Sequence, residues 1–462
     1  MNSIPYLAGW EAVRMIEEEA KQLVDEGRDP QWIEALLGKP RGRQSDAEFW
    51  TELHAAPERK DFPFCEPSDL EGIRSERGAG IRHWTVGYSD DVLMDRMLGA
   101  WLGRCCGCAL GKPVEGFMNA SNGLSSKDRI KTYLQGIAPG EYPLNDYFRV
   151  ASPQQERTGS AICKPSCREH IAFMESDDDI RYTVLGQRVL LGKGAQFTTL
   201  DVMRTWITML AYGQVCTAET QAYRNYVLRY HVRHGIEAEA DWTWVATHQN
   251  PYREWIGAQI RADSWGYAAP GNTGLAAEFA WRDARMSHIK NGIYGEMFVA
   301  AMIAAAFALD EPVAVVEAGL AEIPQNSRLC RDIRQTIDLC RKYDFKADAF
   351  EPVLNGLYDL FGHYSSVHTN NNAAIVVSAL LLGGADFEKV ITIAVMGGWD
   401  SDCNGATAGS IFGAMHGAEK IPLKWKAPLN DTLFSEITDY HPIAISECAR
   451  RSFEIAKRIL SS

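Results

Sequence analysis

The sequence lacks long apolar runs and a surplus of basic residues. Its longest alanine-rich run, residues 297–309, is shorter than the roughly 18–20 residues that a membrane-spanning helix needs. Lysine and arginine number 47 against 60 aspartates and glutamates, which gives a formal net charge of −13. Binding to a nucleic-acid backbone requires a basic face, so this acidity argues against it. We therefore expect neither a membrane nor a nucleic-acid backbone as partner.

The sequence also lacks the signs of a secreted protein. The 11 cysteines are an odd number, and three of them crowd into residues 105–108. No disulfide framework follows from this, and reduced thiols are the simplest interpretation. Residues 1–20 contain three successive glutamates at 17–19 and no basic-then-apolar pattern, so we expect no signal peptide. These features favour a cytoplasmic protein.

Alternating strand patterns are nearly absent, and helical periodicity is frequent. With 46% hydrophobic residues the chain can bury a large core, so the class is predicted to be all-α. We expect residues 1–90 to form an N-terminal helical extension and linker, and residues 91–462 a second domain with an irregular insertion at about 118–170. Predicted helices cover residues 10–25, 30–37, 46–54, 92–110, 180–191, 199–211, 275–287, 295–309, 372–383, 387–395 and 403–416.

Glycine recurs at every fourth position over residues 99–111 and again over 405–417. Positions i and i+4 lie about 40° apart around a helix, so each series forms one stripe. Glycine inside a helix costs roughly 1 kcal/mol against alanine, so the stripes predict very close backbone approach. If the two helices pack antiparallel on each other, Glu115 meets Asp400; packing of each stripe on another core helix is the alternative.

Two acidic motifs stand out. Three successive carboxylates at residues 177–179 indicate either a solvated helix start or a hard-cation site, and alone they favour the helix start. Asp400 and Asp402 follow Gly397-Gly398-Trp399, and residues i and i+2 point about 200° apart on a helix. Both can converge only from a turn, and a helix cap explains only one of them. We interpret this pair as ligands and expect Trp399 to line a pocket.

Together the motifs predict a site with four aspartates. Oxygen ligands without histidine favour magnesium over zinc, and four carboxylates suit two ions.

The chain resembles the ADP-ribosylglycohydrolases, which include the dinitrogenase-reductase-activating glycohydrolase, over about residues 93–425. The motifs occur in the family's order. They are Asp95-Arg96-Met97-Leu98-Gly99, the run from Gly107 to Glu115, Ser176-Asp177-Asp178-Asp179, the run from Gly398 to Cys403, and Ile421-Pro422-Leu423-Lys424-Trp425.

The resemblance implies an orthogonal multi-helix bundle that binds two magnesium ions and hydrolyses the bond at C1 of a ribose, above all in an ADP-ribosylated substrate. Glu115 falls on the family's catalytic glutamate, and Asp178 and Asp400 are expected to share in catalysis. The metal-ligand positions are Ser176, Asp177, Asp178, Asp400, Asp402 and Cys403. The substrate positions are Asn272, Thr273 and Gly274 near a diphosphate, with His288 and Tyr294 near ribose and adenine.

The sequence departs from the family pattern at four places. Cys403 replaces a hydroxyl residue and is a poor partner for magnesium because thiols are soft ligands. Asp179 stands where threonine is usual, and Cys108 replaces an aspartate. Leu275 and the alanines after it stand where an arginine often follows the glycine loop, which weakens the case for a diphosphate.

Three alternatives stay open. One is a glycohydrolase of the same fold that acts on another N- or O-glycoside, with a small molecule as substrate. Another is a two-metal phosphohydrolase, although no histidine adjoins the acidic motifs. The last is a catalytically inactive binding protein. The oligomeric state does not follow from the sequence.

Overall fold

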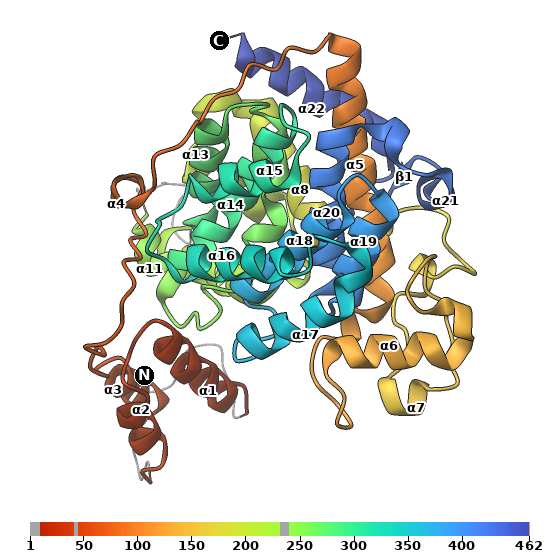
Figure 1. Ribbon diagram of the computed structural model, residues 1–462. Coiled ribbons are helices and arrows are strands. Elements are labelled where there is room, and N and C mark those ends of the chain that lie inside the picture. Colours follow the sequence, from red (N-terminus) through yellow and green to blue (C-terminus); the bar gives the residue numbers. More distant parts are fainter. Residues whose placement is uncertain (1–9, 41–44, 232–239, 462) are drawn as a thin grey trace.

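The computed structural model describes residues 10–40, 45–231 and 240–461, which form 22 α-helices and one short sheet (Figure 1). The predicted all-α class is confirmed. The sheet pairs β1 (Thr432–Leu433) with β2 (Ile443–Ala444) in antiparallel orientation. Among the described helices, none is long and apolar enough to cross a bilayer.

The helices α5 (Asp90–Gly111) and α20 (Ser401–His416) pack on each other through the two glycine stripes, from Gly99 to Gly111 of α5. A Cβ on Gly99 would lie 2.6 Å from the carbonyl oxygen of Gly413, and a Cβ on Gly103 would lie 2.6 Å from the carbonyl carbon of Gly409. The pairing of low with high numbers confirms the predicted antiparallel packing. It brings the end of α5 to the start of α20.

Other buried helices surround this pair. α14 is buried at every position from Asn291 to Ala306, as expected for a helix that is apolar on all sides. The helices of this shell are α8 (Asp178–Lys193), α12 (Asp263–Tyr267), α13 (Thr273–Ala284), α14 (Lys290–Ala306), α18 (Thr369–Gly383), α19 (Phe387–Met396) and α22 (Ile445–Leu460). More peripheral are α9 (Thr199–Met209), α10 (Thr217–Tyr226), α11 (Trp242–Thr247), α15 (Pro312–Leu320), α16 (Arg328–Arg341), α17 (Phe350–Phe361) and α21 (Leu423–Lys426).

The N-terminal helices α1 (Trp10–Asp25), α2 (Pro30–Leu37) and α3 (Asp46–Leu53) share a small hydrophobic cluster. Their predicted bounds are confirmed to within a residue, because Asp29 and Ser45 cap α2 and α3 as the sequence indicates. Residues 1–9 and 41–44 of the predicted extension lie outside the described part of the chain. The expected linker also contains a short helix, α4 (Leu70–Glu76). The domain boundary at residue 90 stays a prediction.

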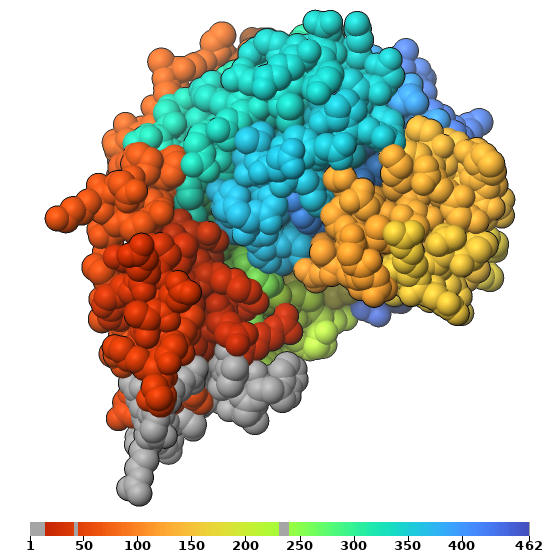
Figure 2. All heavy atoms as spheres, turned by 60° about the horizontal axis from the view of Figure 1, so that its bottom comes forward, coloured from red at the N-terminus to blue at the C-terminus, as the bar shows by residue number. Residues whose placement is uncertain are grey.

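The segment 118–170 is more regular than expected. It contains α6 (Ser126–Ile137) and α7 (Gln155–Thr158). α6 buries Ile130, Tyr133 and Leu134 on one face. The prolines and glycines around it made this helical periodicity hard to recognise in the sequence. Figure 2 shows this orange-to-yellow part of the chain on the opposite side of the cyan and blue helices from the red N-terminal helices.

Candidate active site

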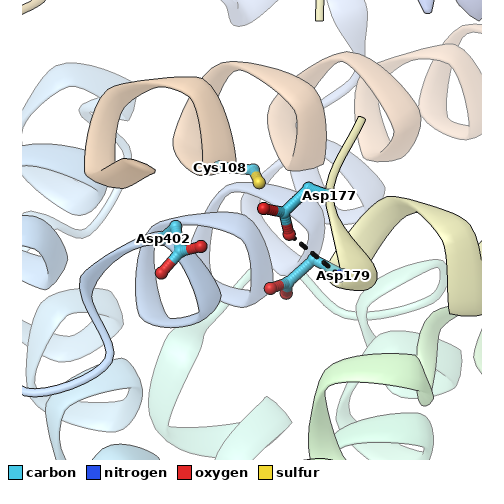
Figure 3. A group of neighbouring side chains, drawn as sticks. All are labelled: Cys108, Asp177, Asp179 and Asp402. Atoms are coloured by element: carbon cyan, nitrogen blue, oxygen red, sulfur yellow. Dashed lines mark hydrogen bonds between the residues drawn. The ribbon is translucent and has the colours of Figure 1, made fainter. Parts of the chain in front are cut away.

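The acidic motifs come together where α5, α8 and α20 meet. Asp177 caps the start of α8 and accepts a hydrogen bond of 2.9 Å from the backbone N–H of Asp179. Figure 3 shows Asp177, Asp179 and Asp402 pointing toward one another and toward Cys108 of α5. Ligand atoms of these four buried residues lie within 4.8 Å of one another. The antiparallel glycine packing therefore joins motifs more than 200 residues apart.

A second group overlaps the first at the start of α20. Potential ligand atoms of Asp400, Asp402 and Cys403 also lie within 4.8 Å of one another. The chain reaches this point through Gly398 and Trp399, whose φ angles are +70° and +52°. This left-handed turn lets both aspartates enter one site, which a regular helix would forbid.

Two internal cations already neutralise part of the cluster. The Lys112 ammonium donates to the backbone oxygen of Ser176 at 2.8 Å and pairs with Asp177. The Arg104 guanidinium pairs with Asp179 at 3.2 Å and with Asp263 at 2.7 Å. Both cationic side chains are almost completely buried.

The remaining acids are not neutralised in this way. Within the described ranges, Asp178, Asp400 and Asp402 have no ion-pair partner, and the buried Oδ1 of Asp402 has no hydrogen-bond partner. The charge of Asp402, followed by burial, raises the pKa of Glu115 to about 10. Burial and the charge of Asp177 raise the pKa of Asp402 itself to about 7. The site therefore carries an excess of negative charge that a proton or a cation must relieve.

The hydroxyl and thiol at the predicted ligand positions have other partners. The Oγ of Ser176 accepts a hydrogen bond from Arg181 at 3.1 Å and donates one to Glu436 at 3.0 Å. The Cys403 thiol donates to Oδ2 of Asp179 at 3.1 Å, and burial raises its pKa. Cys403 is thus placed as a neutral hydrogen-bond donor, and Asp179 stabilises it there.

A pocket of about 310 Å³ opens onto these groups. The predicted site residues that line it are Glu115, Asp178, Asp400, Asp402 and Cys403. The lining also includes Trp255 and, from α1, Arg14 and Glu18. Arg14 is exposed and has no hydrogen-bond or ion-pair partner within the described ranges.

Comparison with known proteins decides the family. Residues 89–454 match the model of the ADP-ribosylglycohydrolase family. The chain belongs to that family. The family implies hydrolase activity, and the predicted resemblance is confirmed. A solved structure named "ADP-ribosylglycohydrolase-related protein complex" is similar at 19% identity and a TM-score of 0.48, over 80% of this chain and 99% of that chain. Among curated proteins, no sequence matches significantly.

The glycine loop that resembles the family's diphosphate segment is covered by the chain itself. The backbone N–H of Trp84 donates to the oxygen of Gly271 at 2.8 Å, and that of Thr273 donates to the oxygen of Arg82 at 3.1 Å. Thr273 also donates to Glu322 at 2.8 Å. Asn272, two positions before Gly274, caps α13 by accepting a hydrogen bond of 3.0 Å from the backbone N–H of Leu275. None of the described residues that line the 310 Å³ pocket belongs to this loop.

The other predicted substrate residues of the family pattern are also occupied by internal contacts. His288 is fully buried and shares a hydrogen bond of 2.8 Å with Ser287, while its Nε2 lies 3.8 Å from the pocket residue Glu219. The Tyr294 hydroxyl donates to the backbone oxygen of Pro67. Trp399 stacks on Tyr358 with ring centroids 4.2 Å apart. These three side chains lie outside the set that lines the pocket.

Sequence reasoning missed several members of the site. Lys112 lies inside the motif that ends at Glu115, and a lysine among small and apolar residues was a usable signal. Cys108 and Asp179 were noted only as departures, yet both belong to the carboxylate cluster. The sequence around Arg14 does not indicate a site residue. Arg14 reaches the acidic pocket only because α1 docks beside it.

Proposed function

We propose that this protein is a metal-dependent glycohydrolase that cleaves the bond at C1 of a ribosyl group. The observation that carries this proposal is the meeting of Glu115, Asp178, Asp400 and Asp402 in the wall of one pocket of about 310 Å³. This volume is at the lower end of the roughly 300–1,000 Å³ typical of small-molecule sites and suits a sugar.

The donor set fits a hard divalent cation. Asp178, Asp400 and Asp402 offer carboxylate oxygens with no internal counter-ion in the described ranges, and oxygens are the ligands magnesium prefers. We propose magnesium held by Asp400 and Asp402, whose ligand atoms lie within 4.8 Å of each other, with Asp178 of the same pocket as a third ligand. A second ion would need Asp177 as a ligand. To bind that ion, Asp177 would have to release the ammonium group of Lys112. When bound, the metal supplies a Lewis acid and a template for ribose hydroxyls and water.

The side chains supply the remaining chemistry. Asp400 and Asp402 orient the sugar at the start of α20, where the turn at Trp399 holds them. Glu115 lies in the same pocket wall and acts as acid or base on the bond at C1, or orients the ribose. Breaking this bond passes through an oxocarbenium-like state, which surrounding carboxylates stabilise.

Family membership favours an ADP-ribosylated substrate. A second candidate, a smaller N- or O-glycoside, is favoured by the coverage of residues 271–274. A diphosphate at this loop would have to displace the backbone of residues 82–84, which is hydrogen-bonded to it.

The test is a turnover screen with magnesium, with and without EDTA, on ADP-ribosyl-arginine, an ADP-ribosyl-serine peptide, simple ribosides and a phosphate ester. We expect metal-dependent sugar release that is lost in Asp400→Asn. Asp359→Asn, an exposed aspartate of α17, is the matched control and retains activity. Release of phosphate instead supports a phosphohydrolase. Absence of both metal binding and turnover supports an inactive binding protein.

A further inference from the structure

A second cavity, of about 570 Å³, adjoins the acidic pocket. It lies between α1, α2 and the segment that precedes α18. The two cavities share Glu18, Trp255 and Ser365 in their lining. We call the larger one the outer chamber. Its α1 and α2 walls come from a part of the chain that precedes the family match at residues 89–454.

Buried polar contacts fix this wall in place. Arg253 pairs with Glu19 at 2.7 Å and with Glu26 at 2.6 Å. Gln22 donates to Glu254 at 2.7 Å. Removing one partner of a buried ion pair is strongly destabilising, so α1 is held firmly against the rest of the protein. The outer chamber is therefore a built part of the fold.

The chamber has an apolar body with polar groups at defined places. Val24, Ile33 and Leu37 supply aliphatic walls, and the half-buried indole of Trp255 stands at the junction with the acidic pocket. Carboxylates on α1 also line it, including that of Glu18, whose Oε1 pairs with Lys21 at 3.3 Å. Such a cavity suits a flat, mostly apolar group that also carries hydrogen-bonding atoms.

His368 adds an unmatched donor to this chamber. Its side chain is 1% exposed, and its Nδ1 accepts a hydrogen bond of 3.1 Å from the backbone N–H of Asn370. Nε2 therefore carries the hydrogen of the neutral ring, and burial lowers the pKa of His368 to about 3. This Nε2 has no hydrogen-bond partner in the described part of the chain. A buried donor without a partner is costly, so a ligand acceptor is expected opposite it.

We propose that the outer chamber binds a planar nitrogen heterocycle of the nucleobase class while the ribose that is cleaved lies in the acidic pocket. This inference rests on the glycohydrolase function proposed above. The ring faces meet Trp255 and the aliphatic walls, a ring nitrogen or carbonyl accepts from Nε2 of His368, and amino hydrogens reach the carboxylate of Glu18. Two substrates carry such a ring: a nucleoside, in which it is the leaving group, and an ADP-ribosyl compound, in which it is the distal adenine.

For a nucleoside the reaction balances with water alone. The bond between C1 and the ring nitrogen breaks, and its electron pair stays on the nitrogen. Water supplies the hydroxyl group to C1 and the proton to the base. The products are ribose and the free base, and no oxidant or other co-reactant is required.

The test uses the full-length protein with magnesium and adenine as the probe, measured by isothermal titration calorimetry. We expect adenine to bind, and Leu37→Trp, which fills the chamber from a partly exposed position, to abolish binding. His368→Phe keeps a ring of similar size and removes the N–H, so it weakens binding roughly fivefold, the effect of one lost hydrogen bond. Leu423→Trp, at a residue that is 72% exposed and outside the chamber lining, is the control and binds as the wild type does. Melting temperatures establish that each variant is folded.

Two further arms distinguish the sources. If adenosine is cleaved, the ring in the outer chamber is the leaving group. If ADP-ribose competes with adenine and adenosine is not cleaved, the ring is a distal adenine. Both outcomes support nucleobase binding in the outer chamber. The inference is overturned if adenine fails to bind to the wild-type protein. It is also overturned if Leu37→Trp and His368→Phe both bind adenine with the affinity of the wild type. If adenine fails to bind while magnesium-dependent sugar release persists, the chamber is wrong and the proposed function stands. If adenine binds while every substrate is inert, the proposed function fails and the chamber stands.

Discussion

Replacing Gly103 by alanine tests how far the site depends on the contact between α5 and α20. The new Cβ would lie 2.6 Å from the carbonyl carbon of Gly409, whereas ordinary contact begins at 3.4 Å. The carbonyl oxygen of Gly409 would lie closer still, so the separation required is more than 3.4 − 2.6 = 0.8 Å. Both sides of the contact are backbone, so no side chain can rotate away to make room.

The expected cost follows from two opposed effects. Overpacking a core costs typically about 1–3 kcal/mol. Alanine recovers up to about 1 kcal/mol of helix propensity. Because backbone meets backbone here, the upper end of that range applies, and we expect Gly103→Ala to destabilise the protein by about 2–3 kcal/mol. The larger effect falls on the site, because α20 carries Asp400 and Asp402 while α5 leads into Glu115. A displacement near 1 Å can reduce a rate roughly 100-fold.

The assay compares chemical denaturation, magnesium binding and turnover for Gly103→Ala and for Gly192→Ala. Gly192 is a helical glycine of α8, and a Cβ added there would have nothing within 4 Å, so alanine at this position is neutral or stabilising. If Gly103→Ala keeps wild-type stability and magnesium affinity, the packing argument is wrong.

Three other perturbations bear on the same account. Removal of divalent metal by EDTA should lower the melting temperature, since a ligand at 100 times its Kd stabilises by about 2.7 kcal/mol; equal melting curves with and without magnesium would contradict this. Lys112→Met leaves Asp177 buried without its partner, so the free energy of unfolding of the metal-free protein should fall by about 3–5 kcal/mol while magnesium binds more tightly. Calorimetry that finds unchanged or weaker magnesium binding would refute the idea that Lys112 and the ion compete for Asp177. Arg253→Met removes the buried guanidinium that pairs with both Glu19 and Glu26 and leaves them with His54 and Lys290 as ion-pair partners, so hydrogen exchange in α1 should accelerate while that in α14 stays slow; uniform exchange would show that the Arg253 pairs do not hold α1.

The glycine stripes and acidic motifs were the most informative parts of the sequence. A repeat of four places glycine on one line of a helix, so the close antiparallel contact of α5 and α20 could be predicted without a structure. The turn at Gly398 was likewise predictable, because two aspartates at i and i+2 cannot share a helical face. Caps such as Asp29 and Ser45 marked helix starts accurately for the same reason: the signal is local.

The features that shape the substrate were not predictable in this way. The docking of α1 depends on Arg253 meeting Glu19, residues separated by 234 positions and unremarkable in their own neighbourhoods. Residues 82–84 cover residues 271–274 through backbone hydrogen bonds. Backbone groups are the same whatever the side chains, so the sequence of residues 82–84 does not reveal this contact. Local patterns thus indicated the metal-binding acids, while the walls of the pocket depend on tertiary contacts.

The most direct test of the central claim is turnover in oxygen-labelled water with magnesium present, followed by immediate trapping and mass spectrometry of the products. The account predicts that the label enters the sugar at C1, because water attacks the ribosyl carbon. Label in released phosphate, with none at C1, would contradict it and transfer the chemistry to phosphoryl cleavage.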